Sequence, residues 1–303
     1  MARSTFNDLT SALNRRHLLQ TTAGGMAALF MGGTSVADDT PAAAEKTAEK
    51  VITKGRLKQS VSRWCFGDVT LADLARASAA MGLKSVEIVG PEDWPVLKEH
   101  GLICALTPSH GIPKGLNDKA NHAQCIESLK KSIEATSAAG FPNVVDLSGN
   151  RFGMADDVGL ANYVEGIKKV VGFAEQKNVT ICLEVLNSRH DHQDYMCDTV
   201  EWAVEACKKV GSPRLKILFD IYHVQIMQGD IIARIKQYHE YIGHYHTAGV
   251  PGRHEMDETQ ELCYPAIMRA IAETGYQGYI GHEFIPTSDP IGKLREMAKL
   301  CDV

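Results

Sequence analysis

Strand-like and helix-like segments alternate eight times between residues 60 and 300, and this regular alternation restricts the fold more than any other feature. The strand-like segments are short apolar runs at 60–65, 85–89, 102–106, 143–147, 180–186, 215–219, 242–247 and 278–284. The helix-like segments follow them at 70–81, 93–100, 118–139, 157–177, 199–210, 231–241, 264–274 and 290–300. Strands that alternate with helices pair in parallel through right-handed crossovers. Eight such pairs close naturally into a (β/α)₈ barrel.

The sequence therefore predicts an α/β protein with a single TIM barrel over residues 55–303. An open doubly wound sheet is the main alternative, but no G-x-G-x-x-G follows the first strand-like segment. The 303 residues, 44% of them hydrophobic, suffice for one domain with a substantial core. None of the eight cysteines forms a C-x-x-C pair, so a zinc ribbon is not predicted.

The N-terminal residues predict a segment that is not part of the barrel. Arg15 and Arg16 precede Leu18, Leu19 and a mild apolar run at 21–30, which together resemble a twin-arginine export signal. Small residues favour cleavage after Ala37, so residues 1–37 are a predicted signal peptide and the mature protein is expected in a bacterial periplasm. The apolar run is shorter than the roughly 20 residues that span a bilayer, so no membrane span is expected. Residues 38–54, rich in Ala, Glu, Lys and Thr, are predicted to be a flexible linker.

Four strand-like segments carry a residue that can bind a metal at or near the end: Glu184, Asp220, His246 and Glu283. In a closed barrel the C-terminal ends of the strands surround one rim, where active sites lie. Unpaired carboxylates are costly to bury, which favours a shared ligand over four unrelated positions. Three carboxylates and one imidazole suit Mn²⁺, Mg²⁺ or Co²⁺ better than a structural zinc site. The sequence therefore predicts a divalent-metal site with these four ligands.

Glu184 and Glu283 are also candidate catalytic residues. A metal that binds a carbonyl and the neighbouring hydroxyl acidifies the C–H bond between them. One glutamate then removes the proton and the other manages its return. This chemistry is typical of aldose–ketose isomerisation or epimerisation through an enediolate.

Several polar residues near these ends are candidates for substrate binding, each with an ordinary structural role as the alternative. They are His223, Arg253, His244, His190 and Glu87. Arg253 could bind a carboxylate, because its guanidinium presents a fork of donors that lysine lacks. His110 and Lys114, in the loop after the third strand, are further candidates for a lid or a substrate contact.

Five motifs give a family resemblance that extends over about residues 60–300. They are E-V-L-N at 184–187, F-D-I-Y-H-V-Q at 219–225, G-H-Y-H at 243–246, V-P-G-R-H-E at 250–255 and G-Y-Q-G-Y-I-G-H-E-F at 275–284. Together they resemble the hydroxypyruvate isomerase family of the xylose isomerase-like barrel superfamily. The resemblance implies the same four metal ligands, an acid–base pair of Glu184 and Glu283, and substrate contacts from His223 and Arg253. His246 stands where hydroxypyruvate isomerases tend to carry Gln and ketose 3-epimerases carry His, so an epimerase acting on a ketose or a sugar acid remains the alternative.

Two other classes are weighed against an isomerase. A hydrolase similar to the apurinic-site endonucleases needs several zinc ions and a basic groove, which a net charge of −5 disfavours. A sugar-binding barrel without turnover would not need both glutamates. The expected partner is a small carbohydrate or hydroxy-keto acid and not a nucleic acid, and a homo-oligomer is left open.

Overall fold

The computed structural model describes residues 50–303, so the predicted signal peptide and most of the predicted linker lie outside the described residues. Eight parallel strands form one sheet in the order β2-β1-β8-β7-β6-β5-β4-β3. The strands are β1 (Lys58–Ser62), β2 (Ser85–Glu87), β3 (Leu106–Thr107), β4 (Asn143–Asp146), β5 (Thr180–Glu184), β6 (Leu215–Asp220), β7 (Ile242–Thr247) and β8 (Tyr279–His282).

The sheet closes on itself almost completely. Between β2 and β3, the two strands at its ends, there is a single bridge from Ser85 to Ile103, supported by the Ile88 N–H, which donates to the Leu106 carbonyl at 2.9 Å. The prediction of a (β/α)₈ barrel is therefore confirmed, with a seam at β2 and β3.

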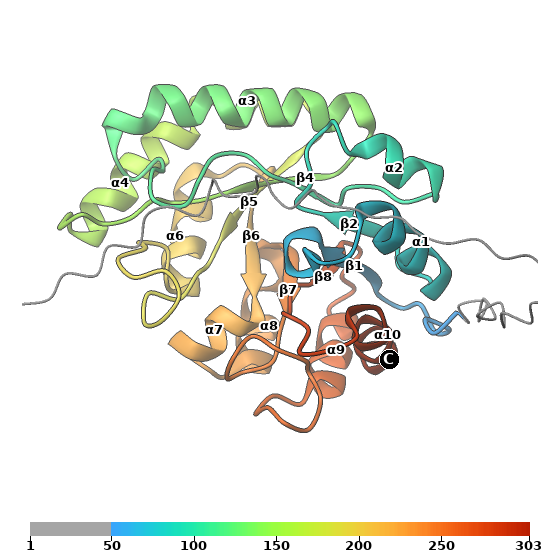
Figure 1. Ribbon diagram of the computed structural model, residues 1–303. Coiled ribbons are helices and arrows are strands. Elements are labelled where there is room, and N and C mark those ends of the chain that lie inside the picture. The colour runs from blue at the N-terminus through green and yellow to red at the C-terminus, as the bar shows by residue number, and fades with distance from the viewer. Residues whose placement is uncertain (1–49) are drawn as a thin grey trace, which may run out of the picture. The chain divides into compact units, whose positions relative to one another are not determined.

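Helices follow the strands and surround the barrel (Figure 1). The α-helices are α1 (Leu71–Met81), α2 (Trp94–Glu99), α3 (His122–Ala139), α4 (Asp156–Ile167), α5 (Val171–Lys177), α6 (Val200–Val210), α7 (Ile221–Met227), α8 (Ile231–Tyr238), α9 (Tyr264–Glu273) and α10 (Pro290–Leu300). Three 3₁₀ turns accompany them at η1 (Arg63–Phe66), η2 (Lys119–Asn121) and η3 (His239–Tyr241). No helix among the described residues is both long enough and apolar enough to cross a bilayer.

Local sequence signals explain where α1 and α6 begin and end. Thr70 caps α1 by accepting from the Asp73 N–H, and Gly82 ends that helix in the left-handed conformation, at φ 103°. Thr199 caps α6 in the same way, and Gly211 ends it at φ 73°. These pairs of start and stop residues are what made the predicted bounds accurate there.

Several elements differ from the prediction. The third strand, predicted at 102–106, is β3 at Leu106–Thr107. The first strand ends at Ser62, because residues 63–66 turn into η1. The helix predicted over 157–177 is two helices, α4 and α5, separated at residues 168–170; Gly166 and Gly172 flank the break and weaken helix formation there. Helix α7 was not predicted, because it begins directly after β6 with no intervening loop.

The barrel interior is polar on the side formed by β1, β2, β7 and β8. Glu87, His244 and His246 are buried on that side. On the outward face of the same strands, the Gln59 amide oxygen lies 2.8 Å from His282 Nε2, and the Thr247 hydroxyl lies 3.0 Å from His282 Nδ1. Burial lowers the pKa of His282 to about 4, so its ring is neutral. The opposite interior side is apolar, with Leu106, Val145, Cys182 and Leu218 packed together. The polar half of the interior supports the rim on which the metal-binding candidates lie.

The start of the described chain is bonded to the barrel. The N–H groups of Val51 and Ile52 both donate to the Met81 carbonyl at 3.1 Å. Asp302, near the other end of the chain, accepts from the N–H groups of residues 53, 54 and 55 at 2.7, 2.8 and 2.9 Å. The described part of the predicted linker is therefore held in place by hydrogen bonds.

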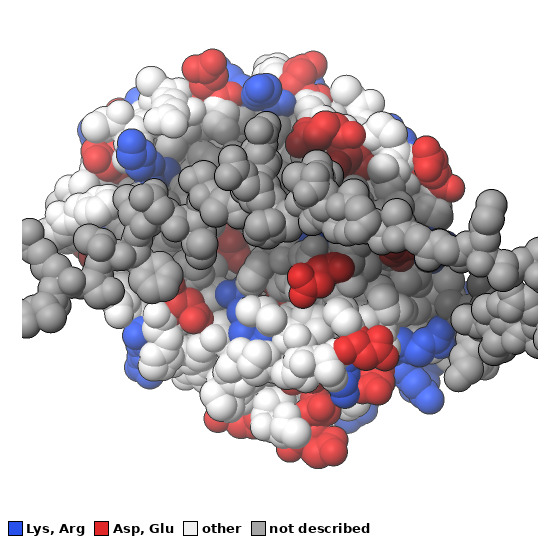
Figure 2. Space-filling view, viewed as in Figure 1, with Lys and Arg blue, Asp and Glu red and all other residues white. Residues whose placement is uncertain are grey.

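Charged side chains of both signs lie on the described surface. On the face shown in Figure 2, Lys and Arg are interspersed with Asp and Glu wherever described residues are visible.

Candidate metal centre and active site

Four side chains from consecutive strands meet at the C-terminal rim of the barrel. Glu184 ends β5, Asp220 ends β6, His246 lies one residue before the end of β7, and Glu283 directly follows β8. One ligand atom from each of the four lies within 4.8 Å of every other. The structure thus brings together the four residues that the sequence proposed as metal ligands.

Asp220 has a structural task besides its place in this cluster. Its Oδ1 accepts from the N–H groups of Tyr222 and His223, at 2.8 and 3.2 Å, and so caps helix α7. Oδ2 is left to face the cluster, 3.4 Å from an Arg253 nitrogen. Burial raises the pKa of Asp220 to about 7, although the positive charge of Arg253 opposes the rise.

The two ring nitrogens of His246 face different partners. Nε2 lies 2.8 Å from Glu87 Oε1, while Nδ1 lies 2.8 Å from Glu283 Oε2 in a direction that makes no hydrogen bond. Burial opposes protonation of this ring, but the carboxylates of Glu283, Glu184 and Glu87 raise the pKa of His246 well above its ordinary value. The Nε2–H donates to Glu87, and a metal held at Nδ1 would take the place of the proton on that nitrogen. A carboxylate that orients a histidine in this way is a common support of a metal ligand.

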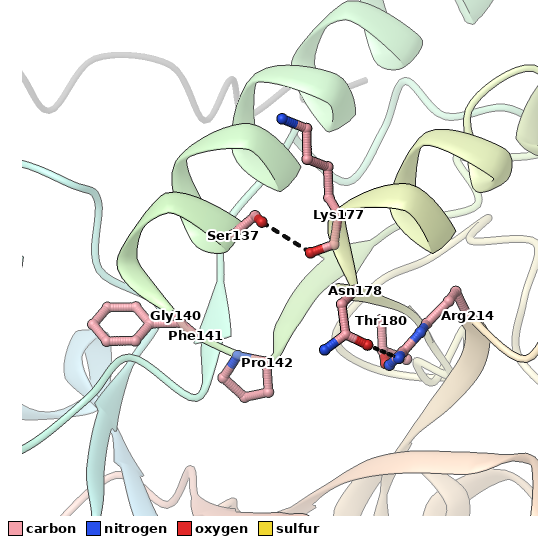
Figure 3. A pocket seen from close by; sticks show the side chains of 8 residues that line it. All are labelled: Ser137, Gly140, Phe141, Pro142, Lys177, Asn178, Thr180 and Arg214. Carbon is pink, nitrogen blue, oxygen red and sulfur yellow. Dashed lines mark hydrogen bonds between the residues drawn. The ribbon is translucent and has the colours of Figure 1, made fainter.

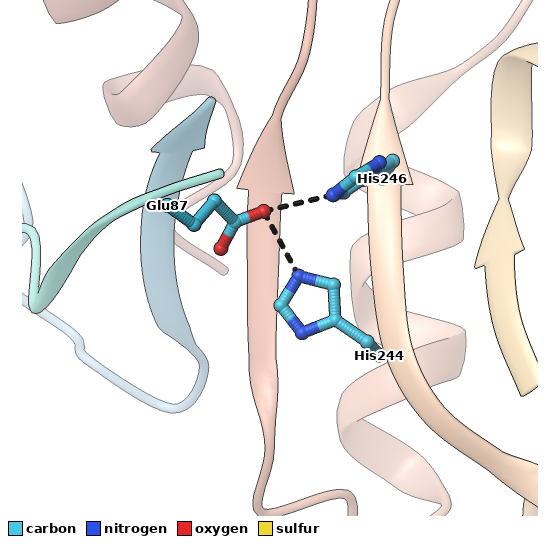
Figure 4. Close-up of side chains that lie close together, drawn as sticks. All are labelled: Glu87, His244 and His246. Atoms are coloured by element: carbon cyan, nitrogen blue, oxygen red, sulfur yellow. Dashed lines mark hydrogen bonds and ion pairs between the residues drawn. The ribbon is translucent and has the colours of Figure 1, made fainter. Parts of the chain in front are cut away.

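Glu87 lies below the rim and holds two histidines at once (Figure 4). Its Oε1 accepts from His246 Nε2 and, at 3.0 Å, from His244 Nε2. All three side chains are buried. Burial would raise the pKa of Glu87, but the two imidazoles outweigh it and lower the pKa to about 2. Its carboxylate is therefore ionised, with Oε1 taken up by the two histidines, and neither Glu87 nor His244 lines the cavity at the rim.

Glu283 is held by donors on both of its oxygens. Oε1 accepts from the Trp64 indole at 2.7 Å and the Ser62 hydroxyl at 3.2 Å, and Oε2 accepts from Arg253 at 2.6 Å. Burial alone would raise the pKa of Glu283, but His246 and Arg253 hold it well below its ordinary value. Glu283 is therefore an ionised carboxylate of fixed orientation.

Arg253 is directed inward by its loop. Its backbone has φ 60°, and its guanidinium lies between the rings of Trp64 and Tyr222, with centroid distances of 5.2 and 5.0 Å. Besides Glu283 and Asp220, it contacts His223 Nε2 at 3.1 Å. Burial and the charge of Arg253 lower the pKa of His223 well below its ordinary value, so His223 is neutral. Of these two predicted substrate residues, Arg253 lines the cavity and His223 lies behind it.

The donor set at the rim fits a divalent cation. It offers oxygens from three carboxylates and one imidazole nitrogen that is buried without a hydrogen bond. Hard oxygen donors with one nitrogen are the ligands that Mn²⁺, Mg²⁺ and Co²⁺ accept. A second group, Glu87 with His244 and His246, is also close together, but the hydrogen bonds between its members already occupy the ring nitrogens that face Glu87.

A cavity of about 380 Å³ opens beside this cluster. Glu184, His246, Arg253 and Glu283 form part of its lining. His190, a predicted substrate residue, lines a neighbouring pocket instead, together with Tyr222 and Glu261. The cavity is large enough for a small sugar or hydroxy acid.

Among the polar and aromatic residues that line the cavity, Trp64 and His192 were not predicted as site residues. Trp64 follows β1 and is 47% exposed although it bonds to Glu283, and its position after a strand was the available signal. His192 is two residues from His190, and the sequence offered no means of choosing between them. His110, a candidate for a lid or a substrate contact, does line the cavity, but nothing in the sequence indicates its buried partner Asp146.

A further pocket, of about 350 Å³, lies at the opposite ends of the strands (Figure 3). Its basic residues already have partners: Lys177 pairs with Glu134 at 2.8 Å, and Arg214 bonds to Thr180 at 3.3 Å. In barrels of this kind the N-terminal ends of the strands serve stability rather than catalysis. We therefore place the candidate active site at the rim alone.

Residues 75–301 match the model of the family described as xylose isomerase-like TIM barrel. A human protein provisionally named hydroxypyruvate isomerase is 26% identical over 250 residues, which cover 75% of this chain and 89% of that protein. The 2-oxo-tetronate isomerase of Pectobacterium atrosepticum is 28% identical over 245 residues, covering 75% of this chain and 92% of its own length. Among solved structures, a 3-keto-D-glucoside 4-epimerase from E. coli has a TM-score of 0.69 at 18% identity, with 81% and 98% of the two chains covered. A family 2 AP endonuclease from Brucella melitensis has a TM-score of 0.70 at 24% identity, with 78% and 97% covered. At these identities, the two solved structures bear on the fold alone.

Proposed function

This chain belongs to the xylose isomerase-like TIM barrel family, and we propose that it is a divalent-metal-dependent isomerase of a small hydroxy-ketone or hydroxy-keto acid. Its relatives named as isomerases, and its epimerase-like fold, support an isomerase or epimerase acting on small sugar-like substrates. The observation that carries the proposal is the convergence of Glu184, Asp220, His246 and Glu283 beside one cavity.

Glu184, Asp220, His246 and Glu283 would hold the metal. When bound, a divalent cation polarises the substrate carbonyl and acidifies the neighbouring C–H bond. Mn²⁺, Mg²⁺ and Co²⁺ all suit the donor set, and Mn²⁺ is our first choice for assay.

The two glutamates differ in how strongly they are held, and we assign them different steps. Among the described residues, Glu184 has a single polar side-chain contact, at 3.6 Å to His246 Nδ1. A carboxylate with free lone pairs can take up the substrate proton, so we assign Glu184 as the general base. Glu283 keeps its orientation through Trp64, Ser62 and Arg253, and we assign it the return of a proton to the other face of the enediolate.

A ketose 3-epimerase is the second candidate. The specific observation in its favour is the imidazole of His246 among the ligands, together with solved epimerases that share the fold, such as D-psicose 3-epimerase. An epimerase inverts one carbon and keeps the carbonyl in place, whereas an isomerase moves the carbonyl. The two reactions are therefore distinguished by the products.

The test is exchange of substrate hydrogen with D₂O. We expect Mn²⁺-loaded protein to incorporate deuterium beside the carbonyl of hydroxypyruvate, a tetronate-derived keto acid or a ketose, as followed by NMR. Glu184→Gln and Glu283→Gln should each lower the exchange rate about 100-fold or more while Mn²⁺ is still bound. Lack of exchange with every compound of such a panel would refute the proposal, as would full turnover by Glu283→Gln.

We propose, in addition, that residues 1–37 direct export by the twin-arginine route, with cleavage after Ala37. The paired Arg15 and Arg16 support this. Replacing both with Lys should retain the protein in the cytoplasm with its leader uncleaved. Fractionation of a bacterial host, followed by mass spectrometry of the mature N-terminus, measures both effects.

A further inference from the structure

The cavity beside the carboxylate cluster is also lined by a histidine from another part of the sequence than the four proposed ligands. His110 lies in the loop after β3 and lines this cavity with a side chain that is 6% exposed. Much of the surrounding wall is apolar, including Ile88, Ile112 and Val145. A single imidazole in an apolar wall is a candidate for orienting one polar group of a ligand.

His110 is held in place by a buried chain of hydrogen bonds. Its Nε2 lies 2.9 Å from Oδ1 of Asp146, the last residue of β4. The other Asp146 oxygen accepts from the Tyr163 hydroxyl at 2.6 Å, and both partners of that bond are fully buried. Asp146 therefore fixes the proton on Nε2. Nδ1 lies 3.3 Å from the Gly111 carbonyl, and the Cys125 side chain is a further neighbour of the His110 ring. A contact this long to the adjacent residue leaves Nδ1 available to a ligand.

The charge of His110 is positive at neutral pH. Burial lowers its pKa, but the hydrogen bond to Asp146 outweighs burial and raises the pKa to about 10. The other basic groups of the lining are already engaged or neutral: Arg253 bonds to Glu283 and Asp220, and burial lowers the pKa of His192. His110 is thus the cation of this cavity that is not committed to the carboxylate cluster.

An adjoining cavity of about 260 Å³ shares His110 and Gly111 with the first and is lined by Lys114 as well. Within residues 50–303, the Lys114 ammonium makes no hydrogen bond or ion pair. His110 at the junction of the two cavities and Lys114 in the adjoining one make this end attractive to an anion.

We propose that His110, positioned by Asp146 and Tyr163, contacts the anionic end of the substrate and selects an acid over the corresponding neutral hydroxy-ketone. This inference rests on the proposed function, because the same bound molecule presents its hydroxy-ketone end to Glu184 and Glu283. His110 contacts the substrate, whereas Asp146 and Tyr163 are positioning residues.

The test compares an unreactive acid with its neutral amide. D-glycerate and D-glyceramide are titrated by calorimetry into Mn²⁺-loaded wild-type protein, His110→Gln and the control His239→Gln, which alters an exposed histidine on η3. We expect His110→Gln to bind D-glycerate about 10- to 100-fold more weakly, the loss of one charge-assisted hydrogen bond, with D-glyceramide binding unchanged. The control should bind both compounds as the wild type does.

Equal binding of D-glycerate by wild type and His110→Gln would overturn the inference, as would an equal loss for acid and amide. Mn²⁺ affinity and melting temperature show whether the variant is folded. If His110→Gln does not fold, the test is whether the wild-type protein binds D-glycerate more tightly than D-glyceramide. Equal binding of the two compounds by the wild type contradicts the inference. A selective loss of D-glycerate binding in a protein that exchanges no substrate hydrogen would leave this inference standing and remove the proposed isomerase.

Discussion

Asp220 shows how one side chain joins the fold to the site. One of its oxygens caps α7 and the other faces the carboxylate cluster, so the residue cannot turn away from the cluster without releasing two N–H groups of the helix. The Glu283 side chain is restrained in a similar way, because its two oxygens accept from separate donors. Ligands restrained in this way lose little side-chain freedom when a cation binds.

Glu87 is the residue whose replacement tests the support of the proposed metal ligand His246. Glu87→Gln offers an amide in place of a carboxylate that accepts from two imidazoles, so the orientation of His246 is no longer enforced. We expect Mn²⁺ affinity to fall about 10- to 100-fold. Titration calorimetry measures the change, with Glu99→Gln on the exposed face of α2 as the control. Unchanged affinity in Glu87→Gln would show that His246 needs no such support.

Strand β8 contributes a glycine that makes room for this network. A Cβ at Gly281 would collide with Glu87 Oε1 and come within 2.8 Å of the His246 ring. Because the interior there is closely packed, the collision cannot be relieved cheaply. Gly281→Ala should therefore lower the melting temperature and weaken Mn²⁺ binding together. Gly172→Ala is the control, because a Cβ at that position meets open space. Gly275→Ala is unsuitable as a control, because its backbone φ of 79° strains any residue that has a side chain.

The loop after β3 should become sensitive to alkaline pH through the pair of His110 and Asp146. The folded pKa of His110, about 10, lies above the roughly 6.5 of an unfolded histidine. Folding therefore takes up a proton between these values, so the contribution of the pair is complete below a pH of about 6.5 and is lost as the pH rises through about 10.

The measurement is the difference in unfolding free energy between wild type and His110→Gln across that pH range, from urea titrations. We expect the difference to be largest at the acidic end and to shrink steadily towards the alkaline end. A difference that stays constant would mean that His110 is not paired with Asp146 in solution.

At the level of elements, the sequence predicted the barrel because each strand–helix pair carries its own signals. Thr70 and Gly82 mark the start and the end of α1 in the sequence, and they cap the helix in the structure. Helix α7 was not predicted because its N-cap, Asp220, is also the last residue of β6. The same residue therefore belongs to the end of a strand and to the start of a helix. The four residues of the cluster were predicted because strand ends converge. The contacts of Glu87 and His110 depend on partners 159 and 36 positions away, which no local pattern reveals.

Two sets of contacts hold the barrel together in addition to the regular pairing of its strands. One is the seam between β2 and β3, and the other is the junction of the first described residues with Asp302. The Asp302 carboxylate, although near the end of the chain, is bonded to three consecutive N–H groups. Both junctions connect the first part of the barrel to later segments.

Asp302→Ala should destabilise the whole protein, because three backbone N–H groups lose their acceptor. We expect a loss of about 1–3 kcal/mol in the free energy of unfolding, measured by urea denaturation. Asp302→Asn, which keeps one acceptor oxygen, should lose less. If the two variants were equally stable, and both as stable as the wild type, the junction would contribute nothing measurable.

The hydrogen bonds from residues 53–55 to Asp302 also have a consequence for biosynthesis. The segment that Asp302 binds leaves the ribosome among the first parts of the barrel, whereas Asp302 itself is translated 249 residues after Thr53. A nascent chain interrupted just before Asp302 would contain every described strand and helix and still lack these bonds. The last step in closing the barrel therefore comes after all of its described elements have been synthesised.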